Sequence, residues 1–279
     1  MTHSRPAVRN LLTDRGLAPR RELGQNFVAD PNTVRRIAAL AGVGPGDDVV
    51  EIGAGLGSLT LALAETGADV TAVEVDRGLA DALESVIDGI GNITLVRGDA
   101  MELDWAALLA GRRVVLVANL PYNVATPLIC DLLDGVPEVA RMLVMVQREV
   151  AERFAAAPRT PAYGAVSVKV AYWATAKVVG LVPASVFVPR PNVESALVAI
   201  ERREPPETDP EPLFRLVRTG FGQRRKMLRR SLAGLVTDEQ FEAAGVAPTA
   251  RPEELDVAAW CRLTDAVAGS DGTTDGADT

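Results

Sequence analysis

The sequence has few of the residues on which many catalytic and metal sites depend. Its 279 residues include one histidine, two cysteines and only 4% aromatic residues. His3 lies in an amino-terminal segment that we expect to be mobile, so histidine catalysis and metal sites are not expected. Cys130 and Cys261 stand far apart in helical patterns and lack metal-ligand spacing. We therefore expect two buried thiols in a reducing, cytoplasmic compartment.

Long apolar runs are also missing. No run approaches the ~18 residues of a membrane-spanning helix, and the polar, arginine-rich residues 1–21 lack the apolar core of a secretory signal. The hydrophobic content of 48% is nevertheless sufficient for a large core. We expect one large domain or a core domain with an appendage, no membrane partner and a monomer.

The net charge of −8 is unevenly distributed along the chain. Residues 1–36 contain seven arginines and three acidic residues, and residues 213–233 contain six arginines, one lysine and no acid. Residues 237–279 contain ten acids and two arginines. Solvated helix faces would explain any single run, but two basic segments in an acidic protein favour an oriented phosphate-binding face.

Alternating strand and helix patterns extend to about residue 150 and predict an α/β fold with a doubly wound, mostly parallel sheet. Expected strands cover residues 48–52, 68–73, 93–97, 114–119 and 141–146, and an antiparallel pair covers 178–182 and 195–200. After a proline-rich linker at 204–210 the pattern is purely helical. The predicted parts are 1–205 (with a basic amino-terminal segment at 1–29), a helical domain at 206–268 and a disordered acidic tail at 269–279.

A glycine-rich motif follows the first of these strands. Glu51-x-Gly53-x-Gly55-x-Gly57 lets the backbone approach a ligand closely, and its alternating glycines differ from the dinucleotide pattern G-x-G-x-x-G. Glu74 ends the next strand, where it could accept hydrogen bonds from ribose hydroxyls, and Asp99 ends the third, where it could accept from an adenine amino group. The set resembles the S-adenosylmethionine site of class I methyltransferases. Singly, each carboxylate could also be a cap of the following helix.

A stiff corner follows the buried strand that begins at Val114. Asn119-Leu120-Pro121-Tyr122 offers a side-chain carbonyl, a backbone carbonyl and an aromatic face at the carboxyl end of a parallel strand. Two acceptors and a stacking surface suit the amino edge of adenine. The alternative is a turn whose tyrosine packs under the sheet.

Together with further motifs, this corner makes the sequence resemble the ribosomal RNA adenine dimethyltransferases over about residues 20–265. The small-subunit branch, that of the kasugamycin-resistance enzyme, is the best fit. Ala54 and Ala171 depart from the family's usual proline and glutamine. The additional matching motifs are Leu23-Gly24-Gln25-Asn26-Phe27, residues 147–153, Tyr163-Gly164, the loop bearing Phe187 and Ser195, and Phe221-x-x-Arg224-Arg225-Lys226-x-Leu228.

The resemblance implies S-adenosylmethionine-dependent dimethylation of N6 on two adjacent adenines in the 3′-terminal hairpin of small-subunit rRNA, carried by a small-subunit particle. Implied catalytic residues are Asn119, Leu120, Tyr122 and Phe187, the last as a second stacking surface or alternatively a core anchor. Implied cofactor contacts come from Gln25, Asn26, Val28, Gly53, Gly55, Glu74, Asp99 and Asn119. Implied RNA contacts come from Arg224, Arg225, Lys226, Arg229 and Arg230.

Three other functions are compatible with parts of the pattern. A dehydrogenase could share the fold, although the glycine spacing and the Asn119 corner argue against it. A large-subunit rRNA methyltransferase conferring antibiotic resistance would share most of the motifs. A ribosome-assembly factor that inspects the particle, with methylation incidental, is a non-enzymatic alternative.

Overall fold

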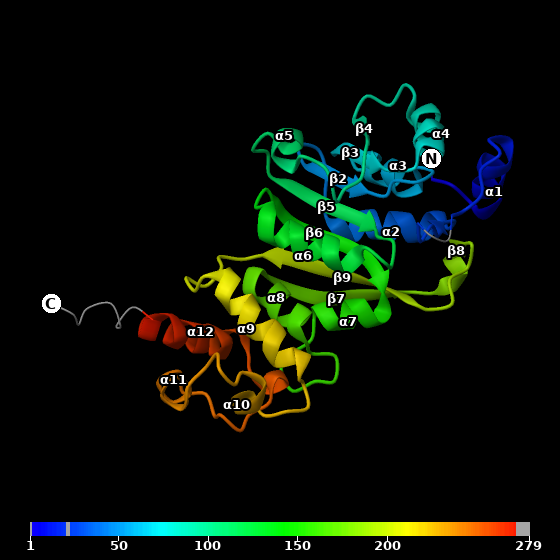
Figure 1. Ribbon diagram of the computed structural model, residues 1–279. Helices are drawn as coiled ribbons and strands as arrows, with labels where there is room; N and C mark the ends of the chain where they lie inside the picture. Colours follow the sequence, from blue (N-terminus) through cyan, green and yellow to red (C-terminus); the bar gives the residue numbers. More distant parts are fainter. Residues whose placement is uncertain (1, 21–22, 272–279) are drawn as a thin grey trace. The chain divides into compact units, whose positions relative to one another are not determined.

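A computed structural model describes residues 2–20 and 23–271. The chain divides into two units (Figure 1). The sheet unit comprises the residues up to Ala151 together with Ala176–Arg202, and the helical unit comprises Glu152–Thr175 together with the residues from Arg203 onward.

The sheet unit contains a mixed sheet with the strand order β4-β3-β2-β5-β6-β9-β7. The neighbouring strands from β4 to β6 in this order are parallel, and β6 pairs with β9 antiparallel. The strands are β2 (Asp48–Ile52), β3 (Asp69–Glu74), β4 (Ile93–Arg97), β5 (Val114–Asn119), β6 (Val139–Gln147), β7 (Ala174–Val182) and β9 (Ser195–Arg202). The predicted doubly wound α/β fold is confirmed.

A second, two-stranded sheet was not predicted. In it β1 (Phe27–Val28) pairs antiparallel with β8 (Phe187–Val188), so a segment near the amino terminus is hydrogen-bonded to the proline-rich loop that precedes β9. The short η1 helix (Ala184–Val186) leads into β8. A strand pair this short has no periodicity that the sequence could reveal.

Helices connect the strands and cover the sheet. They are α1 (Arg5–Asp14), α2 (Pro31–Ala41), α3 (Ser58–Ala64), α4 (Arg77–Ile87), α5 (Trp105–Leu109), α6 (Ala125–Gly135) and α7 (Arg148–Phe154), whose end passes into the helical unit. Helix α2 begins as predicted, because the Asp30 side chain accepts a hydrogen bond from the Thr33 amide at 3.0 Å and Pro31 occupies the first turn. Val34 and Ile37 of α2 pack with Leu63 of α3 and Val70 of β3 in one core cluster.

The prediction of a mobile amino terminus is wrong for the described residues. Helix α1 buries Val8 and Leu12 against Leu56 and Leu79. The His3 ring nitrogen Nε2 lies 2.9 Å from the Leu56 carbonyl oxygen, and burial lowers the pKa of this histidine. The partners are more than 40 residues away, so no local pattern indicates that α1 is held in place.

The helical unit has its own core. It contains α8 (Ala165–Trp173), α9 (Pro210–Gly222), α10 (Leu228–Ser231), α11 (Asp238–Ala243), η2 (Pro252–Glu254) and α12 (Val257–Asp271). Helix α8 belongs here rather than with the predicted domain 1–205, because Tyr163, Val168 and Tyr172 are buried with Phe214 and Trp260. The Tyr163 hydroxyl donates to the Leu255 carbonyl at 2.8 Å. Of the predicted tail 269–279, residues 269–271 are helical, and 272–279 lie outside the described residues.

Candidate active site

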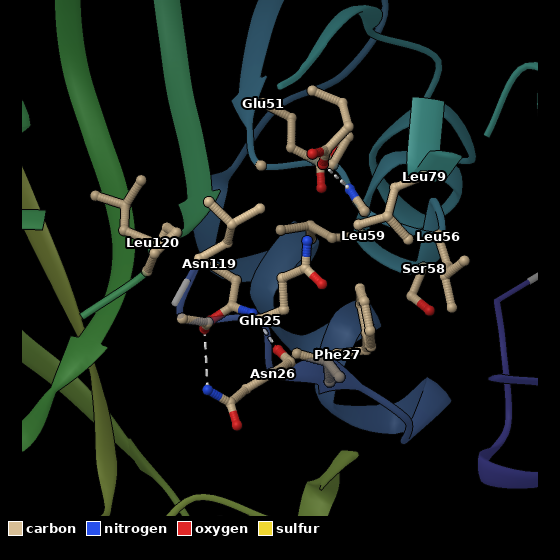
Figure 2. A pocket seen from close by; sticks show the side chains of 18 of the residues that line it. Gln25, Asn26, Phe27, Glu51, Leu56, Ser58, Leu59, Leu79, Asn119 and Leu120 are labelled. Carbon is tan, nitrogen blue, oxygen red and sulfur yellow. Dashed lines mark hydrogen bonds between the residues drawn. The ribbon is translucent and has the colours of Figure 1, made fainter. Parts of the chain in front are cut away.

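A cavity lies in the sheet unit, where β2, β3 and β5 end (Figure 2). This is the position at which open parallel sheets bind ligands. The glycine-rich loop after β2, the end of β3, the corner after β5 and residues 23–28 all line the cavity. Predicted site residues among its lining are Gln25, Asn26, Val28, Gly53, Gly55, Glu74, Asn119, Leu120 and Tyr122. The structure therefore brings together nine residues that the sequence spreads over nearly one hundred positions.

The glycine-rich loop is shaped by contacts that only glycine permits. Gly55 has a φ of +57°, and a Cβ atom there would lie 3.1 Å from the Phe27 ring. The Gly55 amide donates to Glu74 Oε2 at 2.7 Å, which joins the loop to the end of β3. A side chain at position 55 would both strain the backbone and push against Phe27, so the loop keeps its backbone close to the cavity.

Glu74 is buried and already engaged by two backbone groups. In addition to the Gly55 amide, the Asp76 amide donates to its Oε1 at 2.9 Å. Burial raises the pKa of Glu74, and the amide hydrogen bonds only partly offset this effect. Each carboxylate oxygen has further lone pairs, so the predicted acceptance of ribose hydroxyls is compatible with these bonds and stays a prediction.

Glu51 is a lining residue that the site prediction missed. It is 2% exposed, and its Oε2 atom has no hydrogen-bond partner among the described residues. Burial raises the pKa of Glu51 to about 8. The group is therefore largely protonated near neutral pH, and a positive charge bound close by would favour its ionised form. The available sequence signal was an acidic residue two positions before the first glycine of the motif.

The amino-terminal motif is tied to the same region. The Gln25 side-chain nitrogen Nε2 donates to Asp76 Oδ2 at 3.3 Å, and its Oε1 accepts from the Arg20 backbone amide at 2.8 Å. Asp76 also pairs with the Arg20 guanidinium at 3.1 Å and caps α4 through the Leu79 amide. The buried Asp76 therefore orders one wall of the cavity, a role that its position after Glu74 does not reveal.

The corner after β5 is fixed at several points. The Asn119 side-chain nitrogen donates to the Asn26 carbonyl at 2.9 Å, so the Asn119 side-chain oxygen points away from Asn26 (Figure 2). The Leu120 amide continues the sheet by donating to the Met145 carbonyl at 3.1 Å. The Tyr122 hydroxyl lies 2.8 Å from Ser195 Oγ. The predicted acceptor corner is thus rigid and faces the cavity that the glycine-rich loop lines.

Two predicted site residues are not part of the cavity lining. Phe187 is 0% exposed and packs in the main core of the sheet unit, which supports the alternative of a core anchor. Asp99 is exposed, and its Oδ1 accepts a hydrogen bond from the Met101 amide in a turn. The capping alternative is wrong for Asp99, because Asp104 caps the following helix α5. Contact of Asp99 with a cofactor stays a prediction.

The predicted RNA-binding cations gather in the helical unit. Arg224, Arg225, Lys226, Arg229 and Arg230, named here the basic turn, are exposed around the turn from α9 to α10. Amides of this segment are anchored, since Leu228 donates to Ala250 and Arg229 to Pro248. Arg224 is partly engaged, donating to the Pro161 carbonyl at 3.2 Å and lying 3.7 Å from Glu253 Oε2.

Within residues 2–20 and 23–271, no group of three or more histidine, cysteine, aspartate or glutamate residues is placed to hold a metal ion. Across the same residues, no helix has both the length and the apolar character required to cross a membrane.

The sequence matches curated relatives along nearly its whole length. It is 44% identical over 286 residues to the ribosomal RNA small subunit methyltransferase A of Cutibacterium acnes, covering 96% of this chain and 95% of the relative. It is 46% identical over 269 residues to the protein of the same name from Leifsonia xyli, covering 92% and 95%.

Solved structures share the fold. A dimethyladenosine transferase from Plasmodium falciparum superposes with a TM-score of 0.73 at 23% identity, covering 84% of this chain and 94% of that one. The 23S rRNA methyltransferase ErmE superposes with a TM-score of 0.67 at 26% identity, covering 87% and 99%.

The family model described as ribosomal RNA adenine dimethylase matches residues 16–268, which include the cavity and the basic turn. The fold, the glycine-rich loop and the corner at Asn119 agree with this match. The chain therefore belongs to the ribosomal RNA adenine dimethylase family and is a class I methyltransferase that uses S-adenosylmethionine.

Proposed function

We propose that this enzyme dimethylates N6 of two adjacent adenines in the 3′-terminal hairpin of small-subunit rRNA during ribosome biogenesis. The observation that carries the proposal is that the Asn119–Tyr122 corner and the glycine-rich loop line one cavity. The curated relatives at 44% and 46% identity bear the small-subunit name, which supports this substrate over the large-subunit one. We further propose that the enzyme acts as a monomer in the cytoplasm.

The cavity fits a cationic nucleoside cofactor. Gly53, Gly55 and Glu74 would hold its nucleoside part, and Gln25 and Val28 also line the cavity. Glu51, buried and with an unpartnered oxygen, would favour a positive charge close by. When bound, S-adenosylmethionine supplies a methyl group that its sulfonium centre already activates.

The corner would prepare the adenine for attack. An adenine amino nitrogen is a weak nucleophile because its lone pair is delocalised into the ring. If the Asn119 amide oxygen and the Leu120 carbonyl both accept its N–H groups, they favour a pyramidal nitrogen and stabilise the positive charge that develops on it. Tyr122 offers its face to the flipped base. Positioning provides much of the remaining acceleration, and this account requires no histidine base.

The basic turn would bind the substrate particle. Its five cations are exposed on one segment of the helical unit, and exposed arginines and lysines bind nucleic acid mainly through phosphates. Binding should therefore weaken steeply as salt increases.

The test is transfer of labelled methyl groups to small ribosomal subunits that lack these methylations, with large-subunit rRNA assayed in parallel. Dimethyladenosine confined to the 3′-terminal hairpin is the expected result. Label in large-subunit RNA alone would instead indicate the resistance enzymes. No label in either RNA, from a protein that binds the cofactor, would contradict the proposed substrate.

The assembly-factor alternative needs a separate test in cells. A strain that lacks the enzyme would receive either the wild-type gene or an Asn119→Ala variant. If methylation is the function, only the wild type should restore growth. Full rescue by Asn119→Ala would support an assembly role instead.

A further inference from the structure

Tyr122 can act as a stacking surface only if its ring keeps one orientation. The ring is partly buried at the cavity, and its backbone lies in a tight turn in which the Pro121 carbonyl accepts from the Val124 and Ala125 amides. The turn fixes the Cα end of the side chain. The far end of the ring requires a second point of attachment, because rotation about χ1 would otherwise move it.

Ser195 provides this second point. Its Oγ lies 2.8 Å from the Tyr122 hydroxyl, although the two residues are 73 positions apart in the sequence. The distance is that of a normal hydroxyl–hydroxyl hydrogen bond. Burial raises the pKa of the Tyr122 hydroxyl, so it remains protonated near neutral pH.

Ser195 is itself held firmly. It is 0% exposed and begins β9, where it lies opposite Gln147 of β6 in the antiparallel register. The preceding carbonyl, that of Glu194, accepts from the Arg148 amide at 3.0 Å. A buried hydroxyl that loses its partner is costly, so the bond to Tyr122 favours a single arrangement of both side chains.

We propose that Ser195 is a positioning residue for methyl transfer, which orients the Tyr122 ring as a platform for the target adenine through the hydroxyl–hydroxyl hydrogen bond. The proposal rests on the stacking role of Tyr122 in the proposed function. Ser195 does not line the cavity and would act on the substrate only through Tyr122. The resemblance to a family identified the serine as part of a motif but gave it no task.

The test compares Ser195→Ala, Tyr122→Phe and the double variant in single-turnover methyl transfer to undermethylated small subunits. Each single variant removes the bond from one side. The net free energy of a hydrogen bond between neutral groups corresponds to roughly a fivefold to tenfold change in rate. We expect that loss in either single variant and no further loss in the double variant. Affinity for S-adenosylmethionine should stay within about twofold of wild type in all three, since no cofactor contact has been removed.

A spectroscopic readout follows the bond itself. The chain has three tyrosines, so protein labelled with ¹³C at tyrosine Cζ gives three resonances. The one that disappears in Tyr122→Phe is that of Tyr122, and it should shift in Ser195→Ala. Ser167→Ala is the matched control, because Ser167 is also 0% exposed and its hydroxyl donates to the Arg153 carbonyl in the helical unit. It should lower stability without changing the transfer rate.

The outcomes separate two failures. If the wild type transfers methyl groups and Ser195→Ala transfers them equally fast, Ser195 has no positioning role. Losses that multiply in the double variant would also overturn the proposal, because the two hydroxyls would then act independently. If the wild type itself transfers nothing, the proposed function fails, and the role of Ser195 fails with it.

Discussion

The two units of the chain differ in where their functional charged residues lie: they are buried acids in the sheet unit and exposed cations in the helical unit. In the sheet unit, Glu51 and Glu74 are buried in the lining of one cavity, and burial raises the pKa of both. In the helical unit, the cations of the basic turn are exposed, and the buried cluster that includes Phe214 and Trp260 is apolar.

The difference indicates a division of tasks. Desolvated carboxylates interact strongly with a small charged ligand but only over short distances, as a cofactor site requires. Exposed cations interact weakly with each phosphate, yet several of them attract a large polyanion over about a Debye length. The sheet unit would thus carry the chemistry and the helical unit the docking of substrate.

Substitutions of Phe187 test whether a residue outside the cavity lining takes part in methyl transfer. Since the ring is fully buried in the core of the sheet unit, Phe187→Ala should lower the free energy of unfolding by about 3–5 kcal/mol. Phe187→Leu keeps most of the apolar volume and should transfer methyl groups at nearly the wild-type rate. Denaturant unfolding and single-turnover assays provide the two measurements. A stable Phe187→Leu protein that lost at least about tenfold in rate would return Phe187 to the stacking role.

A substitution of Glu51 tests whether its burial makes the stability of the protein depend on pH. Its pKa lies above the ordinary value of 4.5 at about 8, so the folded state holds a proton that the unfolded state releases between these pH values. Its contribution to stability is therefore present below this window and is lost as the pH rises through it, by up to about 1.4 kcal/mol for each pH unit. Glu51→Gln should remove that loss and become more stable than wild type above pH 8.

The measurement is the free energy of unfolding from pH 5 to 9 for both proteins. Glu102→Gln is the control, because Glu102 is exposed and its substitution should leave the pH profile unchanged. Parallel pH profiles for wild type and Glu51→Gln would contradict the assignment of a desolvated carboxylate to this wall of the cavity.

The basic turn gives the smallest expected effect per residue. For binding to small-subunit particles, the logarithm of the association constant falls linearly with the logarithm of the salt concentration. Arg225→Ala should make this slope shallower by about one, without changing the free energy of unfolding. Arg224→Ala should also lower stability, because Arg224 donates to Pro161 and pairs with Glu253. Arg113→Ala, an exposed arginine of the sheet unit outside both basic segments, serves as the control. Equal slopes for Arg225→Ala and Arg113→Ala would remove the basic turn from RNA binding.

Local sequence patterns predicted the features that local forces determine. The buried runs gave the strands from β2 to β6, and the Asp30-Pro31 pair marked the start of α2. The glycine spacing and the corner at Asn119 placed the site at the correct edge of the sheet. Each of these features depends on residues a few positions apart.

The remaining features depend on contacts between distant segments. The Asn119 amide is oriented by Asn26, 93 residues away, and Tyr122 by Ser195, 73 residues away. The attachment of α1 through Val8 and Leu56, and the joining of α8 to the helical core, arise in the same way. Phe187 follows this rule too, since the sequence left a stacking surface and a core anchor as alternatives, whereas pairing of β8 with β1 places the ring in the core.

The most direct test of the central claim is the Asn119→Ala variant, assayed for both cofactor affinity and single-turnover methyl transfer. Asn123→Ala, an exposed asparagine four residues later, is the matched control. The Asn119 amide oxygen is proposed to stabilise charge that develops only during attack, so we expect a loss of about 10²–10³ in rate. Affinity for S-adenosylmethionine should fall only a few-fold, because Asn119 is one of several implied cofactor contacts. Near-normal transfer by Asn119→Ala would contradict the account.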